Sequence, residues 1–103
     1  MGIFNLFKRK KNMDEIQEYL ENGAIVIDVR TVEEYEDGHV LGSKNIVLDT
    51  IPEQVEEIKA LGKSFIAVCR SGARSGQATQ YLTNEGLDII NGGPWGDVDQ
   101  FVE

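Results

Sequence analysis

Apolar residues along this chain follow two spacings that alternate. Residues 24–29 (Ala-Ile-Val-Ile-Asp-Val) and 65–68 (Phe-Ile-Ala-Val) are short, nearly unbroken apolar runs rich in β-branched side chains. Such runs are typical of strands buried on both faces, as in a parallel sheet. Two further short stretches, 44–48 and 87–90, are also strand candidates.

Between these runs the apolar residues recur at helical spacing. Asn12 and Thr31 each precede a helical segment and have a glutamate three residues later, Glu15 and Glu34, which is the pattern of a capping box. Pro52, two residues after Thr50, suits the first turn of another helix. The pattern predicts helices over residues 13–21, 32–36, 51–60, 74–85 and 97–102, and Gly-Gly-Pro at 92–94 is expected to break the chain.

Strands that alternate with helices predict an α/β fold with right-handed crossovers. We expect a small parallel sheet of about five strands with helices on both faces. The 103 residues allow one domain, which we place at 12–103. Residues 1–11 are expected to form a separate tail, apolar first and then basic.

The charge of the chain is uneven. The net charge is -8, but four of the ten basic residues lie together at 8–11, so the other six and the 18 acids give the rest of the chain -12. An acidic body lacks the clustered cations that phosphate contacts need, which argues against nucleic acid as a partner. The basic tail is a candidate for weak contact, through residues 2–11, with a membrane surface or a protein; a frayed terminus packed on the domain is the alternative.

A single cysteine, Cys69, excludes an internal disulfide and fits a reducing compartment, so we expect a cytoplasmic protein. No apolar run approaches the roughly 18 residues that span a bilayer. The one histidine, His39, and the one cysteine do not make a zinc site, and we expect neither a metal nor another cofactor. For His39 we expect a structural hydrogen bond rather than contact with substrate.

The candidate chemistry lies where the second apolar run ends at Cys69. In an open parallel sheet, ligands bind beyond the carboxyl ends of the strands. The glycines that follow let several backbone amides turn inward at the start of a helix, where they favour an anion. These amides and two arginines should lower the pKa of the thiol below its usual value of about 8.5, which favours the nucleophilic thiolate. The segment that carries these features is Cys-Arg-Ser-Gly-Ala-Arg-Ser-Gly at 69–76.

The loop Cys-Arg-Ser-Gly-Ala-Arg-Ser at 69–75 resembles the active-site loop of rhodanese-like domains. A second block, Asp-Val-Arg at 28–30 with Glu-Tyr at 34–35 and Gly-His-Val-Leu-Gly-Ser at 38–43, resembles the same family, as does the Gly-Gly pair near Trp95. The resemblance covers about residues 12–100. It implies sulfur transfer, with Cys69 as the sulfur-carrying nucleophile and with Arg70 and Arg74 helping to bind an anionic donor. It also implies that the backbone amides of the loop form the cradle for the sulfur: those of Arg70, Ser71, Gly72, Ala73, Arg74 and Ser75.

The resemblance also implies the partners: thiosulfate or a persulfide as donor, and a thiol, a protein or cyanide as acceptor. Asp28 and Arg30 end the first strand and are candidates for orienting the Cys69 loop; an ion pair between Arg30 and Glu34 is the alternative.

Two other functions use the same loop. A cysteine-dependent phosphatase or arsenate reductase would have the spacing Cys-x5-Arg, whereas Cys69 and Arg74 are spaced Cys-x4-Arg. A rhodanese-like module that only binds often lacks the cysteine, which this chain keeps.

Overall fold

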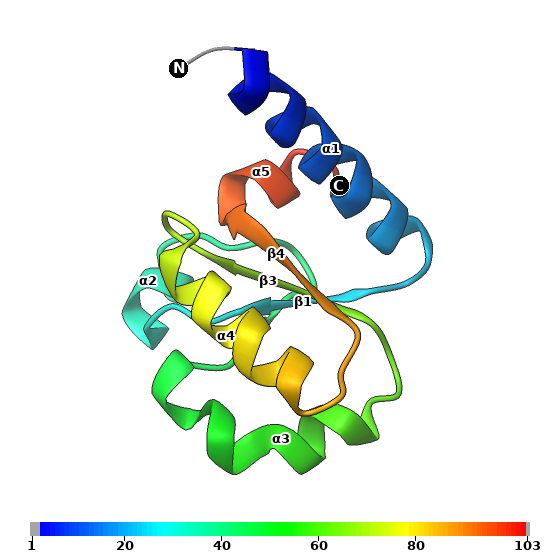
Figure 1. Ribbon diagram of the computed structural model, residues 1–103. Helices are drawn as coiled ribbons and strands as arrows, with labels where there is room; N and C mark the ends of the chain where they lie inside the picture. Colours follow the sequence, from blue (N-terminus) through cyan, green and yellow to red (C-terminus); the bar gives the residue numbers. More distant parts are fainter. Residues whose placement is uncertain (1–2, 103) are drawn as a thin grey trace.

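The computed structural model describes the backbone of residues 3–102 and the side chains of residues 10–102. Its helices and strands alternate along the chain as the sequence predicts (Figure 1). The helices are α1 (Ile3–Glu21), α2 (Val32–Glu36), the 3-10 helix η1 (Leu48–Thr50), α3 (Ile51–Ala60), α4 (Ala73–Asn84) and α5 (Trp95–Asp99). The strands are β1 (Ile25–Asp28), β2 (Lys44–Asn45), β3 (Phe65–Cys69) and β4 (Ile89–Pro94).

The strands form one parallel sheet in the order β2-β1-β3-β4. The α/β fold and the parallel sheet are therefore confirmed. Over residues 3–102 the sheet has four strands rather than about five. The predicted strands all form, and the chain between them and before β1 is helix, turn or irregular, so no segment remains for a fifth.

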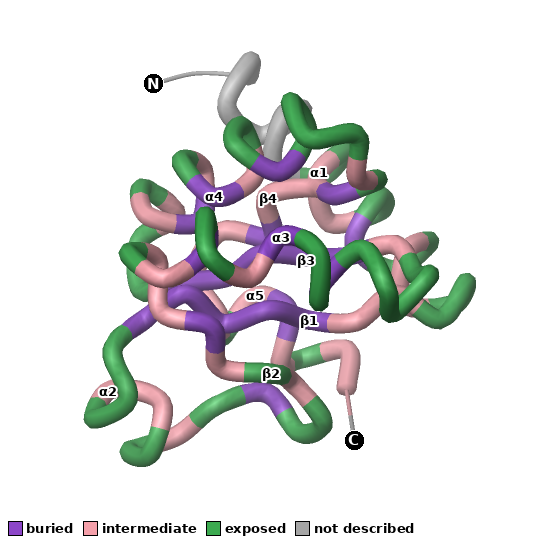
Figure 2. The backbone as a smooth tube through the Cα atoms, turned by 90° about the horizontal axis from the view of Figure 1, so that it is seen from below, coloured by how far each residue is buried: buried purple, intermediate pink, exposed green. Residues whose placement is uncertain are grey.

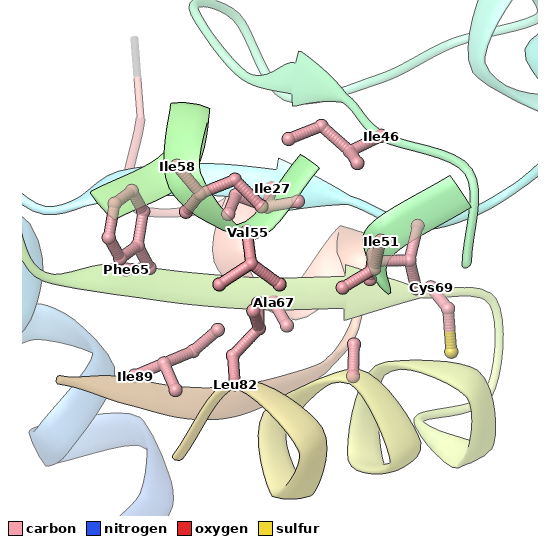
Figure 3. Close-up of a cluster of buried hydrophobic side chains, with 12 residues drawn as sticks. Ile27, Ile46, Ile51, Val55, Ile58, Phe65, Ala67, Cys69, Leu82 and Ile89 are labelled. Carbon is pink, nitrogen blue, oxygen red and sulfur yellow. The ribbon is translucent and has the colours of Figure 1, made fainter. Parts of the chain in front are cut away.

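Helices cover both faces of the sheet, as expected. On one face, α3 and α4 bury residues such as Val55, Ile58 and Leu82 against Phe65 and Ala67 of β3 (Figure 3). On the other face, α1 and α5 bury Ile16 and Val98 against Val26, Ile66 and Val68. All five residues of β3 are buried, and Figure 2 shows buried positions concentrated in β1 and β3. This two-sided burial explains the unbroken apolar runs.

The start of the first helix was predicted wrongly. α1 begins at Ile3, so Asn12 lies inside the helix and does not cap it with Glu15. Neither proline nor glycine occurs between residues 3 and 21, so the helix has no breaker at the predicted start. The division of the chain into a tail at 1–11 and a domain at 12–103 stays a prediction, although the helix crosses that boundary without interruption.

The second capping box is confirmed. The amide of Glu34 donates to the Thr31 hydroxyl at 3.2 Å, and the Thr31 amide donates to the Glu34 carboxylate at 3.1 Å. Thr50 opens α3 at the N-cap position, as expected, but its side chain makes no cap bond: its hydroxyl donates to the Val47 carbonyl instead. β2 is shorter than predicted, because the chain enters the 3-10 helix η1 at Leu48.

The glycine pair does not break the chain as predicted. β4 continues through Gly92 and Gly93 to Pro94, and the pairing shifts there: Ala67 pairs with Asn91, whereas Val68 pairs with Gly93. Gly92 is the extra residue of a bulge. A Cβ on Gly92 would lie 2.6 Å from Ile66 Cγ2, so only glycine fits this position without displacing its neighbours. α5 follows directly, two residues before its predicted start.

Candidate functional site

Cys69 is the last residue of β3, which lies between β1 and β4 in the sheet. Its side chain packs with the cluster under α3 and α4, and Figure 3 shows the sulfur beyond the strand, beside the first turn of α4. The residue has no exposed surface. The expected position at the carboxyl edge of the sheet, followed by a helix start, is therefore present.

Two groups of the following loop contact the sulfur. The amide of Gly72 donates to Cys69 Sγ at 3.0 Å, and the Ser75 hydroxyl lies 3.3 Å from Sγ. Gly72 precedes α4 with φ of +100°, a left-handed conformation that side chains other than glycine rarely adopt. The glycine therefore permits the turn that directs its amide at the sulfur.

The pKa of the Cys69 thiol is lowered from its ordinary value. Burial acts the other way, because a thiolate is less well solvated inside the protein. The Ser75 hydroxyl and the amides of Ser75, Gly72 and Ser71 outweigh burial by stabilising the thiolate. These contacts come from the segment that the sequence identified.

The two arginines of the loop are placed differently. Arg70 is exposed, as are Ser71 and Ala73. Arg74 is part-buried, and its guanidinium nitrogens Nη1 and Nη2 lie 2.7 Å and 3.0 Å from the two carboxylate oxygens of Glu34. This pair lowers the pKa of Glu34 to about 2, with the Thr31 amide helping. Glu34 therefore pairs with Arg74 and not with Arg30, which was the alternative that the sequence left open.

Asp28 and Arg30 instead form a buried pair with each other. Arg30 Nη2 lies 2.7 Å from Asp28 Oδ2 and also donates to the Gly38 carbonyl at 2.8 Å. The guanidinium lies 5.0 Å from the centre of the Trp95 ring. These contacts join β1, the turn at residue 38 and α5, and they do not include the Cys69 loop. A role of the pair in orienting that loop stays a prediction.

His39 makes the structural hydrogen bond that was expected. Its Nδ1 donates to the Tyr35 carbonyl at 2.7 Å, and its ring stacks on Tyr35 with centroids 3.7 Å apart.

Sequence reasoning missed Asn91. Its amide nitrogen donates to the Gly72 carbonyl at 3.1 Å, and its Oδ1 accepts from the Ser75 hydroxyl at 2.7 Å and from the Gly93 amide at 2.9 Å. An asparagine before a glycine pair reads as an ordinary turn signal, so nothing in the sequence linked it to Cys69.

The fold and the site together define the class of the protein: an α/β domain in which a buried cysteine ends a central parallel strand, next to the amides of a glycine loop and a helix start. Comparison with known proteins specifies the family. Residues 12–93 match the family described as Rhodanese-like domain. The chain belongs to this family.

Individual relatives agree with the family match. YqhL of Bacillus subtilis is 40% identical over 67 residues, which are 65% of this chain and 52% of YqhL. Thiosulfate sulfurtransferase GlpE of Stutzerimonas stutzeri is 30% identical over 68 residues, 66% of this chain and 62% of GlpE. The chain thus spans less than two thirds of the length of these curated relatives.

Among solved structures, the rhodanese-related protein of Thermoplasma volcanium is similar, with a TM-score of 0.70 and 26% identity, covering 88% of this chain and 91% of that one.

Proposed function

We propose that the protein is a sulfurtransferase that carries sulfane sulfur as a persulfide on Cys69. The observation that carries the proposal is the contact of Cys69 Sγ with the Gly72 amide at 3.0 Å, at the start of α4. A hydrogen bond to the charged form favours the thiolate, which is the nucleophile. The outer sulfur of a persulfide is anionic as well, and the amides of this loop suit it.

The reaction takes place in two steps. The Cys69 thiolate attacks the outer sulfur of thiosulfate, an S–S bond forms to Cys69, the S–S bond of thiosulfate breaks, and sulfite leaves with the electron pair. The acceptor, cyanide or a thiolate, then attacks the outer sulfur of the persulfide, and the Cys69 thiolate leaves. Neither step needs a general base if Cys69 is already ionised.

Access to the sulfur requires a small movement. Cys69 has no exposed surface, while Arg70, Ser71 and Ala73 of the loop are exposed. Displacement of these three residues opens the sulfur to a small anionic donor. Of the two loop arginines, Arg74 is paired with Glu34, whereas Arg70 forms no ion pair among the described residues. We therefore assign to Arg70 the first contact with the donor.

A phosphatase or arsenate reductase is supported less well. The loop between Cys69 and Arg74 is one residue shorter than the spacing of such enzymes, and the Arg74 guanidinium is paired with Glu34. A module that only binds would not need a hydrogen-bonded thiol. The name of GlpE, thiosulfate sulfurtransferase, also supports sulfur transfer.

The partners follow from the chemistry. The donor is thiosulfate or a persulfide, and the acceptor is a small thiol, a protein thiol or cyanide. A reducing compartment such as the cytoplasm suits a protein whose one cysteine must stay free.

The test is the thiosulfate:cyanide assay with the full chain, Cys69→Ser and, as a folded control, Gln54→Ala. Gln54 lies in α3 and bonds Thr50. We expect thiocyanate from the full chain and the control, and none from Cys69→Ser. Thiocyanate from Cys69→Ser would overturn the proposal, and so would hydrolysis of p-nitrophenyl phosphate without any sulfur transfer.

A further inference from the structure

Among the side chains of residues 10–102, Asn91 is the one that joins β4 to both groups that contact the sulfur. Its Nδ2 donates to the carbonyl of Gly72, whose amide points at Sγ, and its Oδ1 accepts from Ser75, whose hydroxyl lies 3.3 Å from Sγ. Asn91 sits next to Gly92, at the bulge of β4. The bulge therefore positions an amide side chain behind the Cys69 loop.

The orientation of this amide group is determined by its neighbours. The backbone N–H of Gly93 can only donate, and it lies 2.9 Å from Oδ1. The carbonyl of Gly72 can only accept, and it lies 3.1 Å from Nδ2. Exchanging the oxygen and the nitrogen would place donor against donor and acceptor against acceptor. The atom that faces the Ser75 hydroxyl is thus an oxygen.

This orientation determines which atom the Ser75 hydroxyl donates to when Cys69 is a thiol. A hydroxyl donates one hydrogen bond, and Oδ1 of Asn91 can only accept, so Ser75 donates to Asn91 at 2.7 Å. Towards Cys69, at 3.3 Å, the Ser75 oxygen is left to accept from the thiol. When Cys69 is a thiol, the arrangement is therefore Cys69 S–H to Ser75 O–H to Asn91 Oδ1.

The arrangement cannot persist once the thiol loses its proton. A thiolate only accepts hydrogen bonds, so the Ser75 oxygen facing it would be repelled. Rotation about the Ser75 C–O bond turns the hydroxyl proton to the sulfur. Asn91 Oδ1 loses that bond but keeps the one from Gly93 at 2.9 Å. No proton is transferred between residues in this rotation.

We propose that Asn91 is a positioning residue of the Cys69 site. When Cys69 is a thiol, Asn91 accepts the hydrogen bond of the Ser75 hydroxyl; when Cys69 is a thiolate, the hydroxyl rotates and donates to the sulfur instead. In both states Asn91 holds the Gly72 loop through its bond to the Gly72 carbonyl. The proposal deepens the proposed function and rests on Cys69 being its reactive group. Asn91 acts on the sulfur in two opposite ways. Holding the Ser75 proton favours the thiol, while holding Gly72, whose amide donates to the sulfur, favours the thiolate.

A double-mutant cycle separates the two effects. In Asn91→Ala the Ser75 hydroxyl no longer donates to Asn91 and can donate to the thiolate, which lowers the pKa of Cys69. The same substitution loosens the Gly72 loop, which raises the pKa of Cys69. In the Ser75→Ala background only the second effect remains. We therefore compare how much Asn91→Ala changes the pKa of Cys69 in the two backgrounds. The change should be more negative, by about half a pH unit, in the protein that keeps Ser75 than in Ser75→Ala. Half a unit corresponds to the free energy of one neutral hydrogen bond.

The measurement is the pH dependence of Cys69 alkylation by iodoacetamide in the four proteins, with helix content by circular dichroism as the check on folding. Gln54→Ala, which removes another amide-to-hydroxyl bond of 2.7 Å, is the control and leaves the inflection unchanged. Should Asn91→Ala fail to fold, Asn91→Leu fills the same space without polar atoms and enters the same cycle. Equal Asn91 shifts in the two backgrounds, or a difference of opposite sign, would overturn the proposal.

Alkylation does not depend on sulfur transfer. A protein that shows the expected coupling but makes no thiocyanate keeps this inference and loses the proposed function. A protein that makes thiocyanate but in which Asn91→Ala changes the pKa of Cys69 equally in both backgrounds keeps the proposed function and loses this inference.

Discussion

The carboxylate of Glu34 holds the guanidinium of Arg74 through two bonds, of 2.7 Å and 3.0 Å. The pair joins α2 to the first turn of α4, which follows Cys69. Such a two-point contact fixes the guanidinium in place and neutralises part of its charge. Arg74 is therefore a restrained cation beside the site rather than a free one.

Removing the Glu34 charge should improve donor binding. In Glu34→Gln the Arg74 guanidinium keeps its charge without a paired carboxylate, so its field at the site is stronger. We expect KM for thiosulfate to fall several-fold in Glu34→Gln and to rise in Arg74→Ala, measured at low ionic strength. Glu33→Gln is the matched control, because it removes a neighbouring exposed charge. Equal changes in the two glutamate variants would show that the ion pair is irrelevant to the donor.

The same pair makes stability depend on pH in the acid range. Arg74 lowers the pKa of Glu34 from 4.5 to about 2 in the folded protein. A lowered pKa means that the stabilisation is fully present above pH 4.5 and is lost as the pH falls towards 2. The free energy of unfolding in urea should therefore fall more steeply with decreasing pH in the native protein than in Glu34→Gln across this range. The slope of Glu33→Gln should follow the native protein; identical slopes in all three would contradict the assignment.

The bulge of β4 should tolerate no side chain at Gly92. A Cβ there would lie 2.6 Å from Ile66 Cγ2 and 2.9 Å from Val98 Cγ2. We expect Gly92→Ala to lower the free energy of unfolding by about 1–3 kcal/mol, the usual cost of overpacking a core. Gly96→Ala is the control, because Gly96 is helical with no atom within 4 Å of its added Cβ. That variant should gain up to about 1 kcal/mol in denaturant unfolding. Equal effects of the two substitutions would count against the packing argument.

Residues 2–11 are proposed as a contact segment for anionic membrane surfaces. They combine apolar residues with the basic cluster at 8–11, and each lysine or arginine near the headgroups contributes about 1 kcal/mol. We expect the full chain, and not a variant that begins at Asn12, to sediment with anionic vesicles in a salt-sensitive manner. Thiosulfate activity should survive the truncation, because the truncated protein retains Ile16, which α1 buries fully against the sheet. Equal sedimentation of both proteins would refute the membrane contact.

The sequence predicted well the features that depend on local signals. Unbroken apolar runs gave β1 and β3 within a residue or so, because two-sided burial demands them. The Thr31 capping box was found because both partners are three residues apart. Asn12 and Glu15 have the same spacing as Thr31 and Glu34, but both lie inside α1, which begins at Ile3. A four-residue pattern contains no information on whether the residues before it are helical.

The features that were missed depend on contacts distant in sequence. Glu34 and Arg74 are 40 residues apart, and Ser75 and Asn91 are 16 apart. Only the fold determines that Glu34 faces α4 rather than Arg30. Continuation of β4 through two glycines likewise depends on Ile66 and Val98, which leave no space for a side chain at Gly92.

The formation of a persulfide on Cys69 tests the central claim most directly. The full chain would be incubated with thiosulfate, freed of small molecules without reductant, and analysed by intact and peptide mass spectrometry. The account predicts a gain of one sulfur atom, located on the peptide that contains Cys69, lost on addition of cyanide and absent from Cys69→Ser. An unchanged mass in the native protein, or the same gain in Cys69→Ser, would contradict it.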